Sequence, residues 1–240
     1  MKHPPLPHAR MRLFVSAFVW SILASLAVAS VETPPAYLRQ ALARFHSDAP
    51  RGWAYTLTTQ RGNDTSVERY DPSRPKGGEW SLLRNNDREP TADELQRYLR
   101  YKASNAPSTS RASFEKGDID PHSFELLRED DTRAVFRGRL RKDTQEPLLT
   151  HVILELTVLK TEARIEEAKL QLAEPFSPAL GVRMQELVLT MSFQEAPEGS
   201  ETLPRTAHSR FRGRMFFLVP IEEELRIIYS DFERVGSKQP

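Results

Sequence analysis

The sequence has no cysteine among its 240 residues. Thiol catalysis and disulfide bonds are therefore excluded, and a hydrophobic core must hold the fold together. The chain also has almost no net charge, because 34 basic residues stand against 33 acidic ones and give a formal +1. Non-specific nucleic-acid binding needs a strongly positive surface. We therefore expect no nucleic-acid partner.

The sequence also lacks the motifs of an assembled active site. It contains no G-x-S-x-G, no H-E-x-x-H and no glycine-rich phosphate loop. The nearest approach to a metal site is Asp118, Asp120 and His122, and the same residue types are typical of an ordinary turn before a strand. We predict that the protein is not an enzyme and has no catalytic residue, no metal site and no cofactor.

Only one long hydrophobic run is present, and it lies near the N-terminus. Basic residues precede the run Leu13–Ala29, which ends in Ala27-Val28-Ala29, a pattern that signal peptidases cleave. The sequence predicts a signal peptide over residues 1–29 and a periplasmic mature chain. The alternative is an uncleaved membrane anchor, since the run is close to the roughly 20 residues that cross a bilayer.

Two amphipathic helices are predicted in the mature chain. The first follows Thr33, a predicted N-cap, and places Leu38, Ala41 and Phe45 on one face. The second begins with a capping box formed by Thr91 and Glu94 and should run to about residue 102. Residues 104–113 are small and polar and predict a mobile loop. We expect residues 30–240 to form a single domain.

Most of the remaining segments alternate apolar and polar residues with period two, which is typical of antiparallel strands. The alternation is clearest at Leu187, Leu189, Met191 and Phe193 and again at Leu225, Ile227 and Tyr229. The predicted fold class is α+β, with a mainly antiparallel sheet of about ten strands. A twisted sheet of that size tends to curl, and the helices should lie on its concave side.

Aromatic and aliphatic residues of equal strand parity form the candidate apolar ligand cavity. Its predicted lining is Trp53, Tyr55, Trp80, Leu189, Met191 and Phe193. Side chains of equal parity point to one face of a sheet. The alternative is that these side chains fill the core, which is the commoner role of such residues.

Two strands carry alternating basic residues. The candidate basic face comprises Arg137, Arg139, Arg210, Arg212 and Arg214. This face could meet anionic lipid headgroups or an acidic partner protein. The alternative is a solvated sheet face whose arginines pair with acids such as Glu162, Glu166 and Glu167 across the ladder.

The order of predicted elements resembles the LolA/LolB-like superfamily of periplasmic proteins, which carry lipoproteins or other acylated cargo. Locally, the segments 67–72 (VERYDP), 80–83 (WSLL) and 90–95 (PTADEL) resemble a group of proteobacterial secreted proteins. Leu203-Pro204, Gly213 and the segment 229–232 (YSDF) resemble the final strands of such carriers. The resemblance implies an open half-barrel whose concave side accepts an acyl chain.

The leading functional hypothesis is a periplasmic, non-enzymatic carrier or chaperone for an acylated or otherwise apolar ligand of the cell envelope, with lipid or lipoprotein as cargo. The second hypothesis is an envelope protein-interaction module that binds through a sheet edge or the basic face. An enzyme is the third. We expect a monomer.

Overall fold

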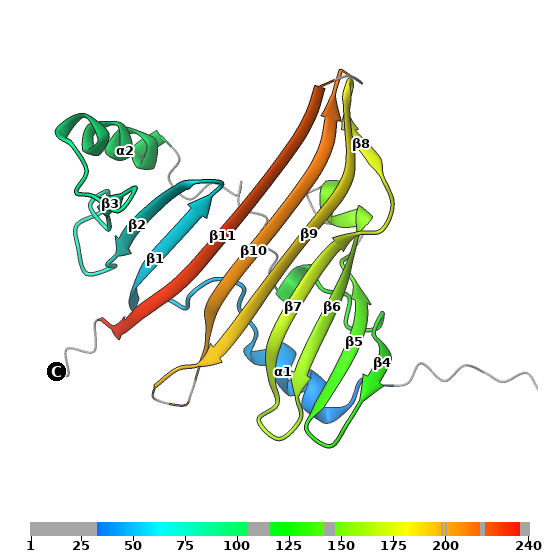
Figure 1. The fold of residues 1–240 in the computed structure, drawn as a ribbon. Coiled ribbons are helices and arrows are strands. Elements are labelled where there is room, and N and C mark those ends of the chain that lie inside the picture. The colour runs from blue at the N-terminus through cyan, green and yellow to red at the C-terminus, as the bar shows by residue number, and fades with distance from the viewer. Residues whose placement is uncertain are drawn as a thin grey trace, which may run out of the picture. The chain divides into compact units, whose positions relative to one another are not determined.

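Eleven antiparallel strands and two α-helices form the described part of the protein, a computed structural model (Figure 1). The structure describes residues 33–104, 116–141, 147–197, 199, 201–216 and 219–235. The predicted signal peptide and residues 105–113 of the predicted loop lie outside these ranges. Among the described residues, no helix is both long and apolar enough to span a membrane.

The strands form one open sheet in the order β3-β2-β1-β11-β10-β9-β7-β6-β5-β4, and β8 pairs with β9 outside this path. The elements are α1 (Ala36–Arg44), β1 (Trp53–Arg61), β2 (Asp64–Tyr70), β3 (Trp80–Asn85), α2 (Ala92–Ser104), β4 (Glu125–Glu129), β5 (Arg133–Arg139), β6 (Val152–Leu159), β7 (Arg164–Leu172), β8 (Phe176–Ala179), β9 (Val182–Glu195), β10 (Thr202–Met215) and β11 (Val219–Arg234). The predicted α+β class and mainly antiparallel sheet are confirmed.

Helix α1 is held by the apolar stripe that its sequence predicts. Leu38 and Ala41 are buried, and Phe45, the residue that ends the helix, is also buried. The ring of Phe45 meets the ring of Phe193 edge-on, with 5.3 Å between centroids. The helix packs on β7 and β6, so its apolar face closes the core over those strands.

The predicted N-cap of α1 is wrong. The helix begins one residue after Pro35, which occupies the N-cap position and provides no side-chain hydrogen bond. Thr33 lies two residues before Pro35. Pro34 and Pro35 separate Thr33 from the helix and keep the backbone before the helix extended. The prolines therefore start this helix through their backbone geometry.

Helix α2 begins with the predicted capping box. The Glu94 N–H donates to Thr91 Oγ1 at 3.3 Å, and the Thr91 N–H donates to Glu94 Oε2 at 2.8 Å. Arg88 donates to both carboxylate oxygens of Glu94, at 2.7 and 2.9 Å, and Asn85 Nδ2 donates at 2.9 Å. This cap thus ties the start of α2 to the end of β3.

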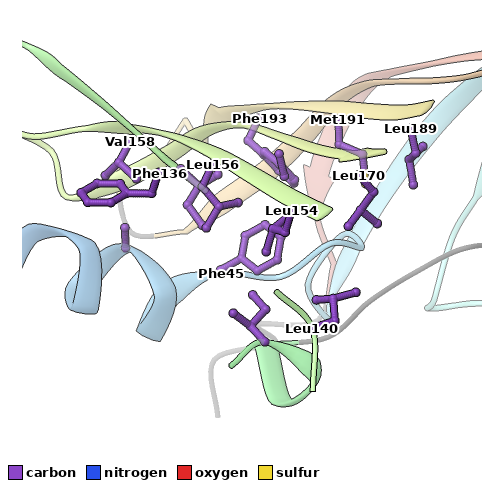
Figure 2. Close-up of a cluster of buried hydrophobic side chains, with 14 of the residues drawn as sticks. Phe45, Phe136, Leu140, Leu154, Leu156, Val158, Leu170, Leu189, Met191 and Phe193 are labelled. Atoms are coloured by element: carbon purple, nitrogen blue, oxygen red, sulfur yellow. The ribbon is translucent and has the colours of Figure 1, made fainter. Parts of the chain in front are cut away.

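The main core lies on a single face of the sheet. Leu154 of β6 pairs with Leu170 of β7, which in turn pairs with Leu189 of β9. Directly paired residues point to the same face, and all three side chains are buried. Figure 2 shows them with Phe45, the residue after α1, among the clustered side chains. The cross-strand register therefore determines which side chains of each strand lie on the core face of the sheet.

We predict that Phe45→Ala lowers the free energy of unfolding by about 3–5 kcal/mol, because it removes a buried aromatic side chain that joins α1 to the sheet. Urea unfolding followed by circular dichroism measures the change. Leu99→Ala is the control: this α2 side chain is 51% exposed, and its loss should change stability by about 0.5 kcal/mol or less. Equal losses in both variants would contradict the packing described here.

The second prediction concerns acid stability. Hydrogen bonds from Arg88, with that from the Thr91 backbone next in effect, lower the pKa of Glu94 to about 2. Because the pKa is lower in the folded protein, the stabilisation is present above the ordinary carboxyl pKa and is lost as the pH falls toward about 2. A carbon-13 NMR titration should give that pKa, and Thr91→Ala should raise it. An ordinary glutamate titration in the wild type would refute the cap.

Candidate functional site

Both helices lie on the same face of the sheet. Lys102 of α2 reaches Glu68 of β2 at 2.8 Å, and its ammonium lies 3.9 Å from the ring centroid of Trp80 on β3. Glu68 and Trp80 share the face of Tyr55, because Tyr55 pairs with Tyr70, and Tyr70 pairs with Trp80. The register carries that face through β11, β10 and β9 to the side covered by α1.

Between the strands that hold the two helices, this face carries a strip of half-buried apolar side chains, here called the apolar strip. It consists of Tyr55, Leu187, Phe211, Leu225, Ile227 and Tyr229. The strip crosses β1, β11, β10 and β9, which are consecutive in the sheet. Leu187, Ile227 and Tyr229 also pack against the main core. The strip is therefore a partly open continuation of the core.

An aromatic cluster forms the end of the strip nearest α2. Its ring centroids lie 4.9–6.1 Å apart for the pairs Tyr70–Trp80, Tyr55–Tyr70, Tyr55–Phe232, Tyr55–Tyr229 and Tyr55–Trp80. Tyr55 is the shared member of four of these pairs. Burial, followed by the Glu79 carboxylate, raises the pKa of Tyr70, so its phenol stays neutral at neutral pH.

An ion pair borders the strip on the same face. Arg61 Nε lies 3.1 Å from Glu223 Oε1. Arg61 pairs with Leu225 across the β1–β11 ladder, and Glu223 pairs with Phe211 across the β10–β11 ladder. Both charged side chains are well exposed to solvent. The strip thus combines an apolar surface with a polar border.

The six predicted cavity residues fall into three groups. Leu189, Met191 and Phe193 are buried in the main core (Figure 2). Tyr55 and Trp80 belong to the aromatic cluster, with ring centroids 6.1 Å apart. That these residues line a ligand cavity stays a prediction.

Trp53, the sixth predicted residue, belongs to a separate small cluster. It packs with Ala196 and Leu203, and its indole N–H donates to Glu201 Oε2 at 2.6 Å. The β1–β11 ladder shifts register between Ala54 and Thr56. This irregularity separates Trp53 from the regular rows that contain Tyr55.

Two hollows on the described part of the protein are lined mainly by polar and charged residues. One, of about 230 Å³, is lined by Gln60, Gly62, Glu224 and Arg226. The other, of about 330 Å³, is lined by Gln185, Glu186, Arg212, Gly213, Arg214, Pro220, Ile221 and Glu222. Neither lining includes a predicted cavity residue or a residue of the apolar strip, so the strip is not part of either hollow.

The predicted basic face carries acidic residues as well. Arg137 lies 3.4 Å from Glu155, and Arg212 lies 3.0 Å from Glu222, which Arg210 approaches to 3.5 Å. Of the acids named from the sequence, Glu166 pairs with Arg133 and Glu162 pairs with Arg164. Three of the five arginines of the predicted basic face, Arg137, Arg210 and Arg212, therefore have a carboxylate partner on a neighbouring strand.

Metal-ligating side chains do not cluster in the described ranges. No group of three or more histidine, aspartate or glutamate side chains there could hold a metal ion. Asp120 accepts the backbone N–H of His122 at 3.0 Å, as in an ordinary turn. His208 contacts Glu224 at 2.8 Å on the exposed polar face.

The signal for the strip was present in the sequence. The alternation of Leu225, Ile227 and Tyr229 marks one face of β11. The predicted cavity nevertheless shares only Tyr55 with the strip. The alternation alone does not predict the strand order, in which β11 lies between β1 and β10.

No protein-family model and no curated protein matches the chain. Among solved structures, it is similar to a domain from Vibrio parahaemolyticus that carries the name of an outer membrane lipoprotein-sorting protein, with a TM-score of 0.40, 12% identity and coverage of 84% of this chain and 94% of that one. A second, an isomerase-inactive variant of GphF DH1, has a TM-score of 0.16, 9% identity and coverage of 83% and 80%. TM-scores of this size carry no conclusion about family or activity.

Proposed function

We propose that the protein is a non-enzymatic carrier that binds an acyl chain or a similarly apolar ligand on the apolar strip. The observation that carries this proposal is the position of the strip. It continues the core on the helix-bearing face, yet its six side chains are only half-buried. An apolar ligand placed there would bury surface that the fold leaves in contact with water.

The dimensions and borders of the strip favour an amphiphile. Neighbouring strands lie roughly 4.8 Å apart, so the distance from β1 to β9 is about 14 Å. The Arg61–Glu223 ion pair at the border could meet a polar headgroup while the strip holds the chain. The ligand would therefore be a lipid or the acyl group of a lipoprotein.

The proposed place of action is the periplasm. It rests on the predicted signal peptide over residues 1–29. In that compartment a protein that carries an acylated ligand would shield the chain from water between two membranes. We also propose that the protein is a member of the LolA/LolB-like superfamily.

The third prediction tests the strip with two adjacent residues of β11. Protein purified from the periplasm should contain an acyl species detectable by mass spectrometry of its lipid extract. Ile227→Thr should lower the bound amount about tenfold, because a buried hydroxyl without a partner costs about 1–3 kcal/mol. Ile228→Thr is the matched control, since this side chain is 37% exposed and lies on the opposite face.

Two results would count against the carrier. One is repeated recovery of protein without any acyl species. The other is equal loss of ligand in the Ile227 and Ile228 variants. Thermal unfolding of both variants establishes that they remain folded at the temperature of purification.

A second candidate function is an envelope interaction module, favoured by the sheet edge at β4. All residues of β4 are exposed, and Leu126 and Leu127 expose 47% and 38% of their surface. An exposed edge strand with apolar side chains is a site where a partner protein can add a strand.

The fourth prediction follows for this edge. If β4 binds a partner, Leu127→Lys should abolish chemical crosslinking to that protein in the envelope, because charge on an edge strand opposes pairing. Leu83→Lys, at an exposed leucine of the other edge strand, β3, should retain it. Crosslinks that survive Leu127→Lys would rule out the β4 edge as the interaction site.

A further inference from the structure

The long central strands end in a tip formed by two turns. One turn, at Leu180 and Gly181, joins β8 to β9, and the other begins at Phe216, directly after β10. Figure 1 shows the ends of these four strands together. The backbone N–H of Phe216 donates to the carbonyl oxygen of Gly181 at 2.5 Å, and Met215 pairs with both Val182 and Val219. The two turns therefore form one structural unit.

Apolar side chains cover this tip and face solvent. Leu180 is fully exposed at 100%, Phe216 is 69% exposed, Val219 is 55% exposed and Met215 is 39% exposed. Turns of this kind are normally occupied by polar residues and glycine. These four residues are called the apolar tip below. A group of exposed apolar side chains at adjoining turns and strand ends marks an interaction site.

The backbone of the tip holds Phe216 outward. Phe216 has φ +47°, in the left-handed region that bulky residues rarely adopt. Its ring lies against Gly181, where an added Cβ would come within 3.2 Å of it. Gly181 itself has φ +79°. The fold thus maintains an unfavourable backbone conformation that leaves a large apolar ring exposed, a feature often found at functional sites.

Two arginines lie directly behind the apolar tip. Arg183 of β9 and Arg214 of β10 are exposed and face each other across the ladder. Like charges in directly opposite positions destabilise a sheet. Within the described residues, neither arginine has a carboxylate partner, whereas the nearby Arg212 pairs with Glu222 and Glu186. This arginine pair would gain from an external anionic surface.

We propose that the apolar tip inserts into the interface of an anionic lipid bilayer. Leu180 and Phe216 would enter the boundary between headgroups and acyl chains, while Arg183 and Arg214 contact the phosphates. The order of the groups favours a bilayer as the partner, because the apolar side chains are outermost and the cations lie behind them. Shallow insertion of apolar side chains and attraction to anionic lipid act together in such binding. This proposal is independent of the apolar strip.

The absence of cysteine allows a site-specific test. Leu180→Cys, labelled with the fluorophore NBD in the full chain, is mixed with vesicles of phosphatidylglycerol and phosphatidylethanolamine. We expect a blue shift and a rise in emission, and neither change with phosphatidylcholine vesicles. Leu99→Cys with the same label is the control, because this side chain is exposed on α2. The emission of the label at Leu99 should not change, even if the protein also binds vesicles through its N-terminal segment.

The charge requirement is tested separately. Arg183→Gln and Arg214→Gln should each weaken the vesicle affinity of the labelled protein about fivefold, the effect of one basic residue near an anionic membrane. The control Arg97→Gln/Arg100→Gln removes charge from α2 and should leave the affinity unchanged. Unfolding is not expected in these variants, since all four arginines are exposed.

Three results would overturn the proposal. The first is an unchanged Leu180 signal with anionic vesicles, or an equal signal at Leu99. The second is full affinity in both tip arginine variants. The third is a dimer, found by equilibrium sedimentation, that Leu180→Ser dissociates while vesicles have no effect, which would make the tip a contact between copies of the chain.

Discussion

The pairing of β10 with β9 on one side and β11 on the other is the constraint on which the rest of the structure depends. A slip of one residue in either ladder would turn every side chain of a strand to the opposite face. In the observed register, Ala207 pairs with Met191 and with Ile227. This single row joins the core under α1 to the apolar strip.

That register also separates the two faces chemically. Arg210 and Arg212 alternate with Phe211 along β10, so they point away from the helix-bearing face. There they meet Glu222 of β11, and exposed pairs of this kind contribute little to stability. The polar face therefore needs no covering layer, while the apolar face supplies the core and the proposed ligand surface.

Local elements could be predicted from the sequence because local contacts determine them. The capping box of α2 depends on two residues three positions apart, Thr91 and Glu94, and the structure has both predicted hydrogen bonds. The apolar stripe of α1 likewise follows from helical periodicity. The wrong cap at Thr33 arose because the adjoining prolines start the helix closer to Ala36.

Features that depend on pairing between distant strands could not be predicted in this way. Strand β1 pairs with β11, although almost the whole described chain separates them. The partners of Arg212 are therefore Glu222 and Glu186 of the two neighbouring strands, and neither is among the acids named from the sequence. A turn at Phe216 separates β10 from β11. That turn creates the apolar tip.

The central claim is that the half-buried strip on the helix-bearing face binds an acyl chain. Methyl NMR spectra recorded with a spin-labelled fatty acid test it most directly, because the label broadens only nearby signals. The account predicts broadening of Leu187, Leu225 and Ile227, with Ile228 on the opposite face unaffected. Broadening of Ile228 to the same degree, or confined to Leu126 and Leu127 on β4, would contradict it.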